Sequence, residues 1–260
     1  MRKHFFILLF FFACLPATSQ EVIHALRHKV SGGGGSSPQY VTGGGEDCTV
    51  GLGNVFNGAC TATTTAAGRT LLIFVESGTV TAPSSVTDSN GTVTTVSAGQ
   101  NWTGGGASTY AVYNASAAAH LITVNWVGGD GGNAAIVVVA YSGANTTNAL
   151  DATPTFYGGT FGMASGGPNC GGATGTSPYT TANSNTSMVS MEATSSATAV
   201  TAPTGFTVRE TVADPSAFHL TVSDNAPTAG TGTPSAGTAY SLVWGSANNY
   251  WGCFQEAIKP

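Results

Sequence analysis

Carboxylates are the side chains of this sequence that could most simply perform hydrolysis, because glycosidases cleave sugars with a pair of acids. From Glu76 onward the acids are scattered singly, with Glu21, Glu46 and Asp47 upstream, and no E-x-E or D-x-D spacing would bring two onto one strand face. Glu76 and Glu192 lie inside apolar stretches, where burial could raise the pKa of a carboxyl. For both, the pattern favours a strand-end or outward-facing carboxylate over a catalytic one.

Other catalytic signatures are absent from the sequence. No G-x-S-x-G motif supplies a serine nucleophile. His120 and His219 fall at or within expected strands, which favours structural, hydrogen-bonded histidines. The pair Gly51-x-Gly53 is followed by Phe56 where a dinucleotide-binding loop needs a third glycine. We therefore predict no catalytic residues and no cofactor.

The acids and cysteines of the sequence are its possible metal ligands. Asp88 with Asn90, and Asp130 beside Asn133, place oxygen donors on tight loops, as calcium requires. Asp and Asn also form ordinary turns, and no loop carries three alternating acids, so turns are favoured over calcium. Zinc is disfavoured because the chain has no C-x-x-C spacing and no His close to a Cys. We predict no metal site.

Aromatic side chains offer a chemistry other than catalysis, since their faces pack on the apolar side of sugar rings. Trp126 and Trp244 lie in strand patterns and are predicted to be core residues. Trp102 lies in the loop-like segment QNWTGGG and is the best exposed candidate. The predicted ligand-binding residues are Trp102, Tyr157, Phe161 and Tyr179.

Composition narrows the possible partners. The chain has 260 residues, of which 42% are hydrophobic and only 7% charged, against about 25% charged in typical globular proteins. Its surface must therefore be wetted largely by Ser, Thr, Asn and backbone groups. With a net charge of -5 and seven Lys and Arg, no basic patch is expected, which disfavours nucleic acid and anionic membranes as partners.

The N-terminus has the pattern of a signal peptide, predicted over residues 1–19. A basic start precedes an apolar core at residues 5–15, and small residues precede Gln20. That core is too short for a membrane span. A lipoprotein signal centred on Cys14 is a less favoured alternative, because Phe11 stands where leucine is expected. Residues 20–37 form a Gly/Ser-rich linker, and residues 38–260 are the predicted domain of a secreted protein.

Four cysteines remain after the signal peptide, and an even number in a secreted chain predicts disulfides. Four cysteines allow three connectivities. The local pair closes the shortest loop and is favoured on entropy. We therefore expect the pairs Cys48–Cys60 and Cys170–Cys253.

Residues 134–145, AAIVVVAYSGAN, predict the central strand of the fold. Ile136, Val137, Val138 and Val139 are β-branched and suited to a pleated sheet. Both faces are apolar, so both should be covered. We expect a second sheet on one face and long loops on the other; a partner subunit is the less favoured cover.

The rest of the chain predicts about a dozen short strands and no amphipathic helix, which indicates an all-β, jelly-roll-like sandwich of two sheets. Asn90-Gly91 predicts a hairpin turn between residues 86–90 and 92–96. Residues 43–59 are expected to form an irregular loop.

In their order, several short motifs resemble a family of bacterial secreted β-sandwich modules. They are GRTLLIFV at 68–75, VTDSNGTV at 86–93, YAVYN at 110–114, LITVNW at 121–126, YSG at 141–143 before Leu150-Asp151, GFT at 205–207, and Trp251 with AIKP at 257–260. The resemblance covers about residue 38 to the end. Residues 43–59 and 158–185 depart from the pattern.

The resemblance implies a lectin-like or adhesive module without an enzymatic role. We accordingly expect a non-catalytic secreted or cell-surface protein that binds a glycan or a surface protein. The alternatives are a secreted glycoside hydrolase with dispersed carboxylates and a self-assembling matrix or filament subunit. The sequence leaves the ligand and the oligomeric state open.

Overall fold

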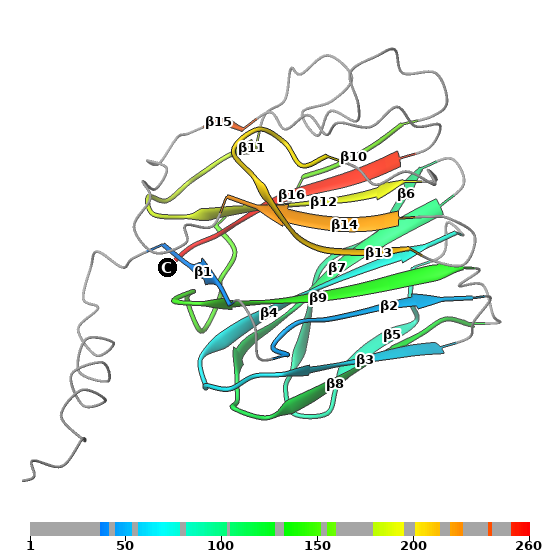
Figure 1. Ribbon diagram of the computed structural model, residues 1–260, viewed down its shortest axis with the longest axis horizontal. Coiled ribbons are helices and arrows are strands. Elements are labelled where there is room, and N and C mark those ends of the chain that lie inside the picture. Colours follow the sequence, from blue (N-terminus) through cyan, green and yellow to red (C-terminus); the bar gives the residue numbers. More distant parts are fainter. Residues whose placement is uncertain are drawn as a thin grey trace, which may run out of the picture. The chain divides into compact units, whose positions relative to one another are not determined.

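The computed structural model describes residues 37–41, 45–53, 57–78, 82–102, 105–127, 133–151, 155–159, 179–194, 201–213, 219–225, 239–240 and 251–260. Within these ranges the regular elements are sixteen β-strands, and they belong to one compact unit, Ser36–Pro260 (Figure 1). The predicted all-β fold is confirmed. No helix in the described ranges is long and apolar enough to cross a membrane. The predicted signal peptide and nearly all of the linker, residues 1–36, lie outside the described residues.

The largest sheet, here called the central sheet, has six antiparallel strands. β9 (Ala134–Ser142) is the predicted central strand, and it pairs with β4 (Arg69–Ser77) on one side. On its other side it pairs with both β1 (Gln39–Tyr40) and β2 (Cys48–Leu52). The sheet continues from β4 to β7 (Gly105–Ala115) and ends at β6 (Val93–Trp102).

Three smaller sheets complete the described fold. The five-stranded sheet has the order β10 (Thr155–Gly159), β16 (Trp251–Ile258), β12 (Ser187–Thr194), β14 (His219–Asp224), β13 (Thr207–Ala213). The three-stranded sheet has the order β3 (Asn57–Thr63), β8 (Ala119–Asn125), β5 (Ser85–Asp88). A two-stranded sheet pairs β11 (Tyr179–Thr180) with β15 (Ala239–Tyr240).

The central strand lies between two hydrophobic cores, as its two apolar faces predicted. Val137, Val139 and Tyr141 pack with residues of the five-stranded sheet, such as Phe254. Ile136 and Val138 pack with the buried side of β8. A second sheet on one face was predicted correctly, but the prediction of loops on the other face was wrong. The three-stranded sheet covers that face, because β3 and β8 alternate buried and exposed residues and so bury one apolar side.

The predicted hairpin at Asn90-Gly91 is not formed. β5 pairs with β8 in the three-stranded sheet, whereas β6 pairs with β7 in the central sheet. The turn therefore carries the chain between layers, and Val86 and Val93 on either side of it pack against the same core. Neither turn residue has a positive φ. Glycine is needed at position 91 for space instead, because a Cβ there would lie 2.5 Å from Asp88 Oδ2 and 2.6 Å from Val112 Cγ1.

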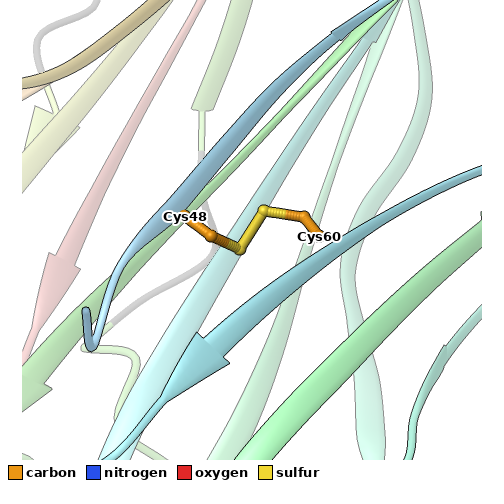
Figure 2. The surroundings of a disulfide bond; sticks show 2 residues. All are labelled: Cys48 and Cys60. Atoms are coloured by element: carbon orange, nitrogen blue, oxygen red, sulfur yellow. A yellow bond between two sulfur atoms is a disulfide. The ribbon is translucent and has the colours of Figure 1, made fainter.

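A disulfide joins Cys48 of β2 to Cys60 of β3, with 6.0 Å between the Cα atoms (Figure 2). This predicted pair is confirmed. The prediction of an irregular loop at residues 43–59 was wrong, because β2 lies within it and pairs with residues 134–138 of β9. Cys253 is also disulfide-bonded. Cys170, its predicted partner, lies outside the described residues, so that pair stays a prediction.

Candidate functional site

The predicted ligand-binding aromatic residues come from different parts of the fold. Trp102 ends β6 and Tyr157 lies in β10, the last strands of the central and five-stranded sheets, and these two strands lie side by side. Tyr179 belongs to the two-stranded sheet and pairs with Tyr240. Phe161 lies outside the described residues. The structure thus brings the strands of Trp102 and Tyr157 to one edge of the sandwich, and ligand binding by all four residues stays a prediction.

The outward side of the three-stranded sheet is an open surface, which we call the outer face. The alternation in β3 leaves every second residue exposed. Small neutral side chains of β5 and β8 lie on the same side of the sheet. The face consists of small neutral residues and one leucine: Asn57, Ala59, Thr61, Thr63, Ser85, Thr87, Ala119, Leu121, Thr123 and Asn125.

Strand register places these side chains in a regular array. Thr61 lies opposite Leu121, and Ala59 lies opposite Thr123, which in turn lies opposite Thr87. Neighbouring strands of a sheet are about 4.8 Å apart, and residues on one face repeat about every 6.7 Å along a strand. Leu121 is 45% exposed. The outer face therefore offers hydroxyls, amides and methyl groups at fixed spacing.

The outer face carries no charge, because the two ionisable residues of β3, β5 and β8 point inward. Asp88 and His120 are fully buried, with 2.6 Å between Asp88 Oδ2 and His120 Nδ1. His120 Nε2 lies 3.0 Å from the carbonyl oxygen of Ser116, so both ring nitrogens are engaged and the expected structural role is confirmed. Asp88 Oδ1 accepts a hydrogen bond from the amide of Asn90, as in an ordinary turn. Asp130 lies outside the described residues.

A polar network lies between the edges of the two large sheets, and sequence reasoning missed it. We call it the seam cluster. It consists of Tyr40 from β1, Asp47 before β2, Tyr141 from β9, Arg209 and Glu210 from β13, and Asp224 from β14.

The inner half of the seam cluster is an ion pair with a tyrosine. The guanidinium of Arg209 donates to Asp224 Oδ1, at 2.7 Å from Nε and 2.6 Å from its terminal nitrogen. The hydroxyl of Tyr141 donates to Asp224 Oδ2 at 2.7 Å. Asp224 is fully buried, so its charge depends on these donors. Burial and then the Asp224 charge raise the pKa of Tyr141, which stays a hydrogen-bond donor.

The outer half of the seam cluster is a pair of carboxyl groups. The hydroxyl of Tyr40 donates to Asp47 Oδ2 at 2.5 Å and lies 3.5 Å from Glu210 Oε1. The Arg209 guanidinium lies 4.6 Å above the Tyr40 ring. Glu210 is hydrogen-bonded to Asp47; burial, followed by this bond and the Asp47 charge, raises its pKa to about 7. Glu210 therefore keeps its proton up to about neutral pH and can donate it in the hydrogen bond to Asp47.

This arrangement differs from that of a glycosidase, whose two carboxyls stand about 5–10 Å apart with the sugar or a water between them. Here the carboxyls are in direct hydrogen-bond contact. Tyr40 and Glu210 are 170 positions apart in the sequence, and no local motif surrounds either residue. Only the packing of the two sheets could reveal the pair.

In the described part of the chain, three glutamates have no exposed surface: Glu76, Glu192 and Glu256. Glu76, the last residue but one of β4, lies at a strand end as expected, although it is buried. The expectation was wrong for Glu192, which lies inside β12 and is buried rather than outward-facing. Burial raises the pKa of Glu192 and of Glu256 to about 8. Among the described residues neither carboxyl has a hydrogen-bond partner. Both are therefore neutral at pH 7, and each lowers the stability of the fold.

The two glutamates face opposite sides of the five-stranded sheet. Glu256 is two positions from both Phe254 and Ile258 and therefore shares their face of the strand, which packs in the core against the central sheet. Glu192 points the other way, because its neighbours Met191 and Ala193 belong to that core. The two glutamates are thus buried on opposite faces of the sheet, and Asp224 of β14 is a third buried acid in it.

Comparisons with models of protein families, with curated proteins and with solved structures found no match to this chain. The resemblance to bacterial secreted β-sandwich modules accordingly stays a prediction. The function has to be inferred from the geometry of the chain itself.

Proposed function

We propose that this chain is a non-catalytic secreted or cell-surface module whose outer face binds a neutral glycan. The observation that carries the proposal is the exposed, uncharged array on β3, β8 and β5. Its hydroxyl and amide groups can exchange hydrogen bonds with sugar hydroxyls. The methyl groups of Thr61 and Thr123 and the side chain of Leu121 can contact the apolar faces of the rings.

We propose a neutral glycan rather than a charged partner because the outer face itself is uncharged. A charged polymer would need counter-charges on the face, whereas Asp88 and His120 are turned inward. The layer is also held in place, since the Cys48–Cys60 disulfide ties β3 to β2. A rigid face loses little conformational entropy when it binds. The disulfide together with the predicted signal peptide supports an extracellular location.

The predicted aromatic residues give a second position where the same ligand could bind. Trp102 and Tyr157, on neighbouring edge strands, could stack on sugar rings with Phe161 and Tyr179. The outer face and the edge that carries Trp102 belong to different sheets, so substitutions distinguish them.

The test is retention of residues 20–260 on a panel of soluble and insoluble polysaccharides. Thr61→Lys and Thr123→Lys each put a charged, long side chain into the outer face. We expect each to weaken retention about tenfold or more on the glycan that holds the wild type. Thr95→Lys is the matched control, because Thr95 is an exposed threonine of β6 in the central sheet. The proposal fails if no glycan retains the chain, or if the outer-face variants bind like the control.

The two alternative functions give different results in the same experiment. Shortened glycan in the flow-through, lost in Glu210→Gln, would identify a hydrolase that acts at the acid pair. Concentration-dependent sedimentation without glycan retention would favour a matrix or filament subunit.

A further inference from the structure

The seam cluster connects the two sheets through polar groups, beside the apolar core that also packs between them. Tyr40 and Asp47 belong to the chain segment that forms the edge of the central sheet. Arg209 and Glu210 belong to β13, the edge strand of the five-stranded sheet, which packs against β2 and β9. The strength of this connection therefore depends on charge and protonation.

A bulge in β13 brings two successive residues into the cluster. The register with β14 shifts between Val208 and Glu210, so Arg209 is an extra residue in its strand. A bulge interrupts the normal alternation of side chains and re-aims them. As a result Arg209 reaches Asp224 and the Tyr40 ring, while Glu210 reaches Tyr40 and Asp47.

The cluster has an excess of negative charge, which a proton on one of its carboxyls reduces. Three carboxyls, those of Asp47, Glu210 and Asp224, meet a single guanidinium. Arg209 is engaged with Asp224, and the hydroxyls of Tyr40 and Tyr141 have one proton each to donate. Glu46, next to Asp47, points to Arg69 instead. If Glu210 ionises, nothing in the described cluster neutralises its repulsion with Asp47.

We propose that the seam cluster is a proton-operated clasp: a proton shared by Asp47 and Glu210 holds the segment with β1 and β2 against β13, and loss of that proton loosens the contact. Glu210 has a pKa of about 7 when the clasp is closed. In an open clasp it returns toward its ordinary value near 4.3. Opening therefore releases a proton, becomes easier as pH rises from about 4 to about 7, and is constant at higher pH. The clasp does not depend on the proposed glycan function.

The amide of Val41 reports on the clasp. It follows Tyr40 directly and donates a 2.9 Å hydrogen bond to the carbonyl of Ala140 in β9. We would measure its hydrogen exchange at pH 5 and pH 8, corrected for the intrinsic rate. In the wild type we expect protection to fall about tenfold or more between these values. In Glu210→Gln, whose amide keeps a donor toward Asp47 at any pH, protection should be the same at both.

Two further variants make the result decisive. Asp47→Asn removes the repelling charge but not the burial that is the largest cause of the raised Glu210 pKa, so it should weaken the pH response without abolishing it. Glu192→Gln alters a buried acid on the far face of the five-stranded sheet and should leave the response at Val41 intact. The carboxyl carbon of Glu210, followed by NMR, should titrate near pH 7. Equal protection of Val41 at both pH values in the wild type, or a Glu210 that titrates near pH 4.5, would overturn the proposal.

Discussion

Cys48 and Cys60 are 12 positions apart in the sequence, yet their disulfide joins two different sheets. Cys48 pairs with Val138 of β9 in the central sheet, and Cys60 pairs with Ile122 of β8 in the three-stranded sheet. Both cysteines pack against the apolar core between these layers. A disulfide between residues close in sequence thus holds two sheets together. One of them is the three-stranded sheet, which carries the proposed glycan-binding face.

Replacement of both cysteines by alanine should cost about 3 kcal/mol of unfolding free energy, the loop-closure value for a loop of this size. Urea unfolding measures it. Hydrogen exchange should accelerate in β3 more than in β4, because β3 loses its covalent link whereas β4 stays between β7 and β9. A variant as stable as the oxidised wild type would contradict the role given to the disulfide.

Gly91→Ala should destabilise the chain by about 1–3 kcal/mol through overpacking. The added methyl would meet Asp88 Oδ2 and Val112 Cγ1, both closer than 3 Å. Thermal unfolding measures the loss, and Val112→Ala in the same chain should recover part of it. Gly205→Ala is the control, because Gly205 has a φ of 83° and no atom within 4 Å of an added Cβ. Its loss, about 1 kcal/mol, should not respond to Val112→Ala.

Stability should fall as pH rises from about 4 to about 8. Glu192 and Glu256 have a pKa of about 8 in the fold, against about 4.3 in the unfolded chain. At low pH both states are protonated; as pH rises the unfolded chain ionises first, which favours unfolding until the folded carboxyls also ionise. The loss is at most about 5 kcal/mol for each carboxyl. Urea midpoints measured between pH 4 and 9 test this.

Glu192→Gln and Glu256→Gln separate the two contributions, because each amide removes one titrating group at nearly constant volume. Each should raise stability at pH 8 and flatten part of the pH dependence. Neither should change stability much at pH 4, where the native carboxyls are already neutral. Identical pH profiles for both variants and the wild type would show that these acids find charge partners in the folded protein.

A strand could be predicted where the pattern of apolar residues in the sequence matches the burial of its two faces. The β-branched run at residues 136–139 identified β9, because this strand lies in the middle of the central sheet and both of its faces are covered. β2 was not predictable, since CTVGL is short and weakly apolar, and only pairing with β9 orders it. The turn at Asn90-Gly91 was misread because local turn preference does not determine which strands pair across it.

The outer face and the seam cluster also differ in how far the sequence predicts them. The outer face follows from alternation in β3 and β8, but its exposure became evident only when the third layer was known. The seam cluster depends on contacts between Tyr40, Asp47 and Glu210, which come from two sheets and have no common motif. Burial of Glu192 and Glu256 was likewise a consequence of layering that no short pattern encodes.

Trp102→Ala decides between the two proposed glycan positions. If the sugar stacks at the edge strand β6, this variant should lose retention while Thr123→Lys retains it; if the sugar lies on the outer face, the reverse should hold. Stacking on an aromatic ring contributes about 0.5–1.5 kcal/mol beyond buried area, so the loss in retention should be several-fold or more. Equal retention by both variants and the wild type would place the ligand elsewhere.

Arg209→Met should cost about 3–5 kcal/mol, because it leaves the fully buried carboxylate of Asp224 without its cation. Adding Asp224→Asn should recover most of that loss, since the partner is then uncharged. Arg69→Met offers a matched comparison: Glu46 loses its cation but keeps the hydrogen bonds from Thr65, so the cost should be smaller. Urea unfolding of the four chains measures these differences. A double variant no more stable than Arg209→Met would mean that Arg209 acts through its packing on Tyr40 rather than through its charge.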